Sequence, residues 1–280
     1  MILFGPAGND DHFYEEGYKS TLEAPKWVNS LGLNAYEYSL ARGTNLSDET
    51  ALKLNEAFSE YNIKISVHAP YYINFACPEE QVEKSYNWVI QSAKKVKLLG
   101  GNRVIVHPAS CGKLEREEAV KLTKQRFIEL SKRLTEENLN DVFICIETMG
   151  KSAQIGTYQE VVDFCSVADN FIPTFDFGHI NALTQGSLKT KEDYEKIFNY
   201  AIDKLGFEKI KHCHIHFSKI EFALKGEIKH LTLEDQTYGP EFLPLAKALK
   251  QLNLEPVIIC ESKGIMAYDA VSLKQIYENA

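Results

Sequence analysis

The sequence lacks the features that mark membrane, secreted and repetitive proteins. No run approaches the ~18 consecutive apolar residues that a membrane-spanning helix requires. The opening residues, MILFGPAGNDD, show neither the basic start nor the long apolar stretch of a secretory signal peptide. No stretch has the biased composition of a disordered or collagen-like segment. We therefore expect a globular, cytoplasmic protein that does not bind membranes.

The cysteines are too scattered to form a redox or zinc-ribbon motif. None of the six forms a C-x-x-C pair, and several lie inside apolar runs, where a reduced cysteine behaves as a small buried side chain. Structural thiols are the preferred interpretation over a disulfide framework. The residues are Cys77, Cys111, Cys145, Cys165, Cys213 and Cys260.

Positive charge is also scarce. The 31 Lys and Arg residues against 39 Asp and Glu residues give a formal net charge of −8. This balance argues weakly against a nucleic-acid-binding protein. Net charge does not describe any one face, however, and three bound divalent cations would offset six of these eight charges. Charge alone therefore does not exclude DNA as a partner.

What the chain does contain is a repeated alternation of β-rich runs and helical patterns. Eight such units over 280 residues average 35 residues each, which is typical of a (β/α)₈ TIM barrel. A doubly wound open sheet is the alternative, but no Gly-rich phosphate turn follows the first run. We predict a single α/β TIM-barrel domain over residues 1–280. The expected strands are 2–8, 34–40, 63–70, 102–109, 141–148, 171–179, 209–217 and 255–262, and the expected helices are 47–62, 79–101, 114–138, 157–169, 191–206, 240–253 and 269–279.

Residues that bind metals follow or close six consecutive strands at the end where a TIM barrel carries its active site. Any one of them is more often a hydrogen-bonded core histidine or a solvated carboxylate. Six together need a common explanation, because burying an unpaired charge costs several kcal/mol. Zinc, manganese and iron accept imidazole and carboxylate ligands and would compensate that cost. The set is His68, His107, Glu147, Asp176, His179, His214, His216 and Glu261.

The seventh run, KIKHCHIHF, places His212, His214 and His216 on every second residue and therefore on one face of a strand. His212 is expected to lie deepest. Spacing alone does not choose between His214 and His216 as the ligand. The long connection that follows carries Glu227 and His230, which we expect to fold over the barrel mouth.

Taken together, these motifs resemble the endonuclease IV family of apurinic/apyrimidinic endonucleases. VHAPYYINF is similar to the family's H-x-x-Y-x-I-N segment, VIVHPAS to its HPG stretch, and ICIETMGK to its IENTAG stretch. TFDFGHINA is similar to D-x-x-H-x-x-A, HIHFSK stands in the place of HLNDAK, and IICES stands in the place of LET. The resemblance runs from His68 onward and keeps the order of the motifs. It implies a monomeric TIM barrel with three Zn²⁺ ions, or Mn²⁺ or iron in their place.

The resemblance also implies a role for each ligand. His68 and His107 would hold the first ion, Glu147 would bridge it to the second, and Asp176, His214 and Glu261 would complete the second. His179, Glu227 and His230 would hold the third. Glu147 and Glu261 are the expected catalytic residues. His214 is favoured over His216 because His216 stands where the family has Asn.

The implied reaction is hydrolysis of the phosphodiester bond on the 5′ side of an abasic site in double-stranded DNA, leaving a 3′-hydroxyl and a 5′ deoxyribose phosphate. Two metals about 3.5–4 Å apart suit such a displacement. Tyr71 and Tyr72 are expected to insert into the base stack. The family's Gln-rich loop is absent, and SLARGTNLS stands in its place with Arg42 as the candidate DNA contact. His216 would either support the ligands from outside or face the substrate. The third ion's ligands depart from the family, because Glu227 and His230 form E-x-x-H where the family has D-x-H.

Two alternatives belong to other functional classes. A sugar isomerase or epimerase on the same barrel would use one metal held by Glu147, Asp176, His214 and Glu261, but it would leave the other histidines without a shared role. A non-catalytic binding protein on a relic barrel would show decayed ligands, and only the third site is irregular.

Overall fold

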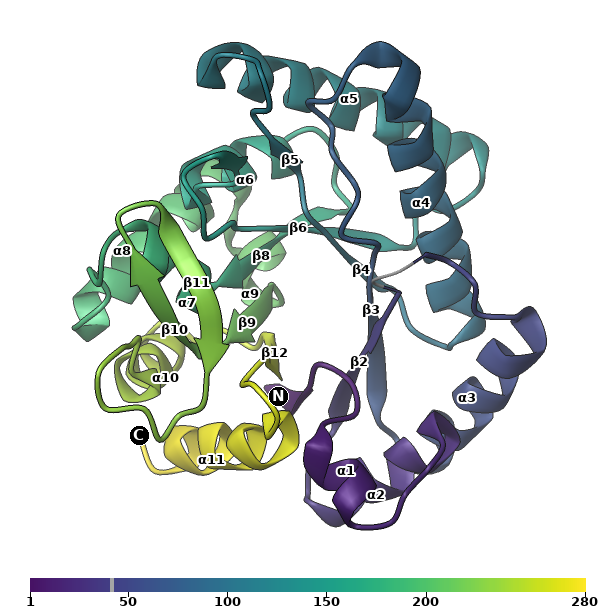
Figure 1. Cartoon of the computed structure of the whole chain (residues 1–280), viewed down its shortest axis with the longest axis vertical. Helices are drawn as coiled ribbons and strands as arrows, with labels where there is room; N and C mark the ends of the chain where they lie inside the picture. The colour runs from purple at the N-terminus through teal and green to yellow at the C-terminus, as the bar shows by residue number, and fades with distance from the viewer. Residues whose placement is uncertain (41–42) are drawn as a thin grey trace.

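The computed structural model describes residues 1–40 and 43–280, and at its centre eight parallel strands form a ring (Figure 1). Their order around the ring is β1-β12-β9-β8-β6-β4-β3-β2. The two end strands meet at Asn34, whose backbone N–H donates to the Phe4 carbonyl at 3.1 Å and whose Oδ1 accepts from the Phe4 N–H at 2.8 Å. The predicted TIM barrel is thereby confirmed. The strands are β1 (Leu3–Pro6), β2 (Ala35–Ser39), β3 (Lys64–His68), β4 (Arg103–Val106), β6 (Phe143–Glu147), β8 (Phe171–Asp176), β9 (His214–Phe217) and β12 (Val257–Cys260).

The helices surround this ring and cover the outer face of the strands (Figure 1). Ser47 is the N-cap of α3, where its side chain accepts a hydrogen bond from the Thr50 backbone N–H. Within the described ranges, no helix is long and apolar enough to cross a bilayer. The helices are α1 (Asp11–Glu15), the 3₁₀ turn η1 (Thr21–Glu23), α2 (Ala24–Ser30), α3 (Asp48–Glu60), α4 (Glu79–Leu98), α5 (Arg116–Glu136), α6 (Tyr158–Cys165), α7 (Phe177–Leu183), α8 (Lys191–Leu205), α9 (Phe207–Lys211), α10 (Phe242–Gln251) and α11 (Met266–Glu278).

The main apolar core lies between the strands and the helices. Phe127 of α5 packs against Phe164 of α6 and Phe171 of β8, with ring centroids 5.4 and 6.0 Å apart. Two smaller apolar clusters lie apart from this core, one around Ala35, Val257 and Ile259 and one around Ile105, Cys145 and Ile172. All six cysteines are free thiols, and four of them are buried, as the structural interpretation requires.

A β-hairpin, β10 (Lys219–Ala223) and β11 (Gly226–Leu231), lies over one side of the barrel (Figure 1). It is fastened to the loop after β6 by two backbone bonds, from Glu227 N–H to the Gly150 carbonyl at 2.9 Å and from Ser152 N–H to the Lys225 carbonyl at 3.1 Å. A two-residue pairing of β5 (Ala109–Ser110) with β7 (Gln154–Ile155) joins the loops beside it. The hairpin is thus fixed at the barrel mouth.

All eight strands are shorter than the predicted runs, and in two of them a helix takes up the rest of the run. The run from Lys209 begins in α9, and His212 ends that helix, so only His214 and His216 are in the strand. The run from Phe171 ends at Asp176, because the Asp176 side chain caps α7 by accepting from the His179 N–H at 2.7 Å. In both cases a helix end replaces part of an apolar run that sequence periodicity could not separate from a strand.

Candidate metal centre

The end of β3 and the loop after β4 bring two histidines onto one oxygen of Glu147, the last residue of β6. His107 Nε2 lies 2.9 Å from Glu147 Oε2, and His68 Nε2 lies 3.3 Å from the same atom. The other ring nitrogen of His68 is hydrogen-bonded to the Ala69 carbonyl at 2.8 Å, which fixes the ring orientation. These three residues form the first group.

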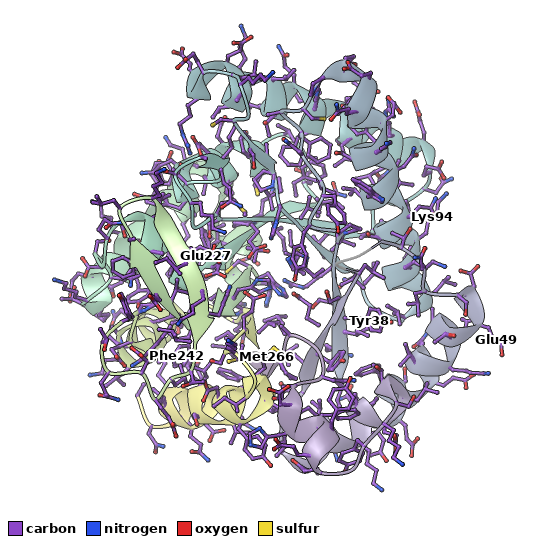
Figure 2. The ribbon with its side chains drawn as sticks, viewed as in Figure 1. Tyr38, Glu49, Lys94, Glu227, Phe242 and Met266 are labelled. Atoms are coloured by element: carbon purple, nitrogen blue, oxygen red, sulfur yellow. The ribbon has the colours of Figure 1, made fainter. Side chains whose placement is uncertain are left out.

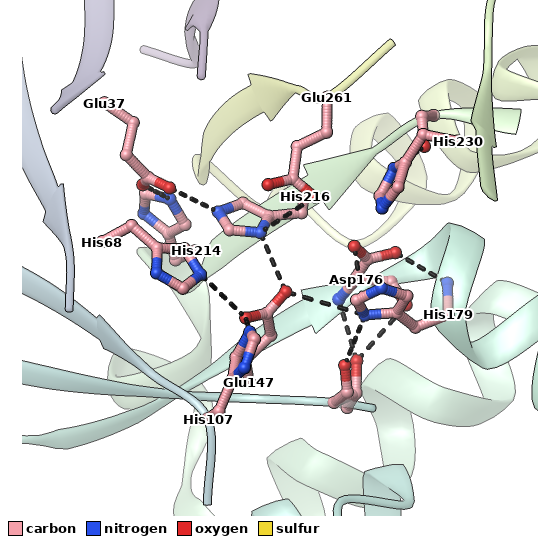
Figure 3. Close-up of polar contacts among 12 residues, drawn as sticks. Glu37, His68, His107, Glu147, Asp176, His179, His214, His216, His230 and Glu261 are labelled. Carbon is pink, nitrogen blue, oxygen red and sulfur yellow. Dashed lines mark hydrogen bonds and ion pairs between the residues drawn. The ribbon is translucent and has the colours of Figure 1, made fainter. Parts of the chain in front are cut away.

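The second oxygen of Glu147 faces a different set. His216 Nδ1 lies 3.0 Å from Glu147 Oε1 and 3.5 Å from Glu261 Oε2, and Asp176 completes a group whose donor atoms all lie within 4.8 Å of one another (Figure 3). Glu147 therefore belongs to both groups, one oxygen toward each. This is the position of a bridging carboxylate.

The third group combines a barrel residue with the hairpin. His179, held in α7 by the Asp176 cap, has Nε2 3.5 Å from Glu227 Oε2, and His230 Nε2 lies 3.9 Å from Glu227 Oε1. Ser218 Oγ lies 2.8 Å from His230 Nδ1 and orients that ring. Figure 2 labels Glu227 on the hairpin above the packed side chains of the barrel. Despite the irregular E-x-x-H spacing, Glu227 and His230 therefore come together with His179.

The sequence analysis favoured His214, but the structure brings His216 to Asp176, Glu147 and Glu261. Strand pairing decides this, because β8 and β9 place Asp176 opposite His216 and Thr174 opposite His214. His214 lies one layer deeper, with Nε2 3.1 Å from Glu37 Oε2. His212 lies at the opposite end of the barrel, where its Nδ1 approaches the Glu255 carbonyl at 3.3 Å.

The charges of these groups depend on one another. Burial opposes ionisation of Glu147, but His107 and His216 hold the pKa of its carboxyl well below the ordinary value. Burial lowers the pKa of His107, despite the neighbouring Glu147. Burial also lowers the pKa of His68, but Glu147 raises it above the ordinary value. Burial acts in the same direction on His179, but Asp176 and Glu147 raise the pKa of that ring to about 9. Burial raises the pKa of the Glu261 carboxyl.

The donor set fits divalent metal ions. Glu147 and Asp176 are each 1% exposed, yet Glu147 Oε2 and Asp176 Oδ2 accept no hydrogen bond, although imidazole nitrogens lie within ion-pair distance of both. Buried carboxylate oxygens without hydrogens pointed at them are costly unless a cation compensates. Imidazole nitrogens face the same oxygens, which is a mixed N/O set suited to Zn²⁺, Mn²⁺ or Fe²⁺. The groups open into a pocket of about 300 Å³.

The predicted DNA-contacting residues have different positions. Tyr71 is 52% exposed, and its ring lies 4.9 Å from that of His68 and 5.3 Å from that of His107, at the edge of the pocket. Tyr72 is 64% exposed and packs 6.0 Å from the Trp88 ring, outside the pocket. Arg42 lies outside the described residues. His216 is fully buried and so lies among the candidate ligands rather than facing a substrate.

Sequence reasoning missed four residues of the site. Met149, Lys151 and Gln154 line the pocket from the loop after β6, and no residue pattern in that loop marks them. Glu37 lies below the pocket, 1% exposed, in β2. The sequence did mark Glu37, because the run AYEYS places a single carboxylate between aromatic neighbours in a predicted strand.

Comparisons with known proteins agree with the TIM-barrel fold. The profile of the family described as xylose isomerase-like TIM barrel matches residues 25–274. An uncharacterized protein of Methanocaldococcus jannaschii is 34% identical over 278 residues, covering 99% of this chain and 97% of the relative. A protein of Ureaplasma urealyticum named "Probable endonuclease 4" is 29% identical over 179 residues, covering 60% of this chain and 57% of the relative. The resemblance to endonuclease IV is thereby confirmed at the level of sequence.

Solved structures of two functional kinds share the fold. Endonuclease IV from Thermus thermophilus superposes with a TM-score of 0.69 at 18% identity, covering 94% of this chain and 96% of that one. A D-tagatose 3-epimerase-like protein superposes with a TM-score of 0.66 at 22% identity, covering 88% of each chain. At these identities the likeness establishes the barrel and does not choose between the two activities.

Proposed function

The chain belongs to the xylose isomerase-like TIM barrel family, and within that family we propose that it is a metal-dependent DNA-repair endonuclease. Its reaction is hydrolysis of the phosphodiester bond 5′ to an abasic site in double-stranded DNA, leaving a 3′-hydroxyl and a 5′ deoxyribose phosphate. Among the described residues there are four groups of donor atoms, and the observation that carries the proposal is that three of them converge at the barrel mouth and two of these three share Glu147. Zn²⁺ is the expected ion, and three are expected per chain.

The ligand assignment follows the geometry and replaces His214 by His216. We assign His68, His107 and Glu147 to the first ion and Glu147, Asp176, His216 and Glu261 to the second. His179, Glu227 and His230 hold the third. Bound divalent cations supply Lewis acidity and activate water at neutral pH.

The chain's own residues supply position and proton transfer. Glu147 fixes the spacing of the first two groups, because its two oxygens face different partners. Glu261 is the assigned proton acceptor, since its side chain lines the pocket and is 17% exposed. Lys151 lines the same pocket and is exposed, so its ammonium is placed to contact a phosphate.

The mouth carries exposed apolar side chains suited to unstacking a damaged duplex. Tyr71 stands beside the first group, and on the hairpin Leu224 is 93% exposed and Ile228 52% exposed. Apolar wedges of this kind kink DNA, and an abasic position yields at the smallest cost. Tyr71 is therefore the preferred wedge, and Tyr72 contributes to the outer rim.

A second candidate, a one-metal sugar epimerase, is favoured by one observation. The second group contains two glutamates, one aspartate and one histidine, which is the donor set expected for that class, and the D-tagatose 3-epimerase-like protein has the same fold. Against it stand the first and third groups, which a one-metal enzyme does not use. The relic-barrel alternative predicts decayed ligands, whereas the irregular Glu227–His230 pair lies beside His179.

The deciding experiment measures metal content and activity on the same purified full-length chain. About three metal ions per chain, with incision of an abasic duplex oligonucleotide that is lost in chelator and in Glu261→Gln, supports the endonuclease. Glu208→Gln, in α9 at the opposite end of the barrel, is the control and retains incision. One ion per chain, no incision and interconversion of ketohexoses would overturn the proposal in favour of the epimerase.

A further inference from the structure

Below the metal centre, the interior of the barrel contains a second polar layer. Glu37 of β2, Ser66 of β3 and His214 of β9 are 1%, 3% and 0% exposed. The Ser66 hydroxyl donates to Glu37 Oε2 at 2.8 Å, and His214 Nε2 lies 3.1 Å from the same oxygen. An ionised carboxylate only accepts hydrogen bonds, so this nitrogen of His214 is the donor.

The remaining oxygen of Glu37 faces the metal centre through one residue. Glu37 Oε1 lies 3.0 Å from His216 Nε2 (Figure 3). On the other side of the same ring, His216 Nδ1 faces Glu147 Oε1 at 3.0 Å and Glu261 Oε2 at 3.5 Å. The imidazole of His216 therefore spans the two layers, with one nitrogen in each.

We propose that Glu37 is a positioning residue that makes His216 a ligand through Nδ1. A neutral imidazole carries one proton, and its other nitrogen offers the lone pair. Glu37 Oε1 and His216 Nε2 lie 3.0 Å apart and neither atom hydrogen-bonds to any other group, so a proton on Nε2 faces the carboxylate and the lone pair of Nδ1 is directed at the second group. Carboxylate partners of this kind set the tautomer, the orientation and the basicity of a metal-bound histidine.

His214, the deeper histidine, holds Glu37 in place in the same arrangement. Ser66 and His214 both bond to Glu37 Oε2 and leave Oε1 for His216. The alternation of His214 and His216 along β9 thus provides one histidine that anchors Glu37 and one that Glu37 orients. The inference rests on the metal centre of the proposed function, but not on its DNA substrate.

The test compares wild type with Glu37→Gln, using Co²⁺ and Zn²⁺ as probes. In Glu37→Gln the amide can donate to Nε2 and favour the wrong tautomer of His216. We expect the number of bound ions to be unchanged, the affinity for one ion to fall about 10–100-fold in competition with a chromophoric chelator, and the visible Co²⁺ bands to shift. Glu56→Gln, the same substitution at an exposed position of α3, is the matched control, with an affinity close to that of wild type.

Circular dichroism checks the fold of each variant. Should Glu37→Gln not fold, Glu37→Asp keeps the charge, withdraws it from His216 and is expected to weaken the same ion. Unchanged affinity and unchanged Co²⁺ bands in the folded variant would overturn the inference while leaving the metal centre intact. A fourth ion in wild type that is lost with Glu37→Gln would also overturn it, because Glu37 would then be a ligand itself. Absence of metal binding in wild type would overturn the metal centre as well.

Discussion

The candidate metal centre has two parts built by different means. Six of its nine side chains stand at the ends of barrel strands or directly after them, whereas Glu227 and His230 reach the same pocket from a hairpin outside the barrel. His179 joins them from the first turn of α7. The strand-borne part is held by the hydrogen-bonded ring of the barrel. The hairpin-borne part is held by two backbone bonds to the loop after β6, by the Gln185 amide, which donates to the Ala223 carbonyl at 2.9 Å, and by the buried Ile220 side chain.

This difference teaches where the site is rigid and where it is adjustable. Strand ends in a closed barrel are fixed by neighbours on both sides, so their side chains keep their spacing without a metal. A docked hairpin can be released while the barrel stays intact. The first two groups are therefore expected to persist when the third is lost. The reverse is not expected, because His179 depends on Asp176.

Glu147→Gln is the sharpest way to break the strand-borne part. The amide keeps one oxygen and replaces the other with a donor, so Glu147 can no longer offer an oxygen to both the first and the second group. We expect fewer than three retained ions per chain and a drop in incision of abasic DNA of more than about 100-fold, beyond the loss typical of a supporting partner. Metal analysis and a gel-based incision assay measure this.

Glu60→Gln, at the exposed end of α3, controls for a general effect of losing a carboxylate. A Glu147→Gln protein with three ions and full incision would show that the two groups do not share this residue functionally.

The pH dependence of the stability of the metal-free protein tests the role of His179, the residue that joins the two parts. Burial alone would lower its pKa, but Asp176, Glu147 and Glu227 raise it to about 9, above the unfolded value of about 6.5. The protonated ring therefore stabilises the fold fully below about pH 6.5, and this contribution is lost as the pH rises through 9. It amounts to on the order of 3 kcal/mol.

Thermal unfolding in chelator from pH 6.5 to 9.5 measures this loss. We expect the midpoint to fall with rising pH, and His179→Gln to reduce the slope. The metal-saturated protein should show a flatter profile, because a ligated imidazole is already without that proton. A metal-free midpoint that rises over this interval would contradict the assignment.

Gly226→Ala separates the hairpin-borne part from the barrel. Gly226 has φ +100°, and a Cβ there would lie 2.0 Å from the Gly150 carbonyl oxygen, at the junction that positions Glu227. We expect one ion fewer per chain, or one ion bound about 10–100-fold more weakly, with the other two retained.

Gly239→Ala is the matched control, because its nearest contacts to an added Cβ are 3.6 Å away. Loss of all ions in Gly226→Ala would mean that the barrel part depends on the hairpin, and it would remove the distinction between the two parts.

Much of the barrel and part of its site could be predicted from the sequence. The alternation of runs indicated eight strands because strand and helix periods differ, and strand-end ligands such as His68, His107 and Glu147 stood out among apolar neighbours. The short helices α1, α2, α7 and α9 were missed, because the few apolar residues of a short segment fit either period. The hairpin was read only as a long connection, since its partner is a distant loop.

The sequence by itself determined which residue types line the mouth and which face of each strand carries them, because side chains in a strand alternate with a period of two. It did not determine how deep in the barrel each of these side chains lies. His214 and His216 share a face, and only the pairing of Asp176 with His216 across β8 and β9 decided which one reaches the metal centre. The contact of Glu37 with His216 likewise joins residues far apart in the chain. Register and closure of the barrel are tertiary properties, set by neighbouring strands that no local pattern contains.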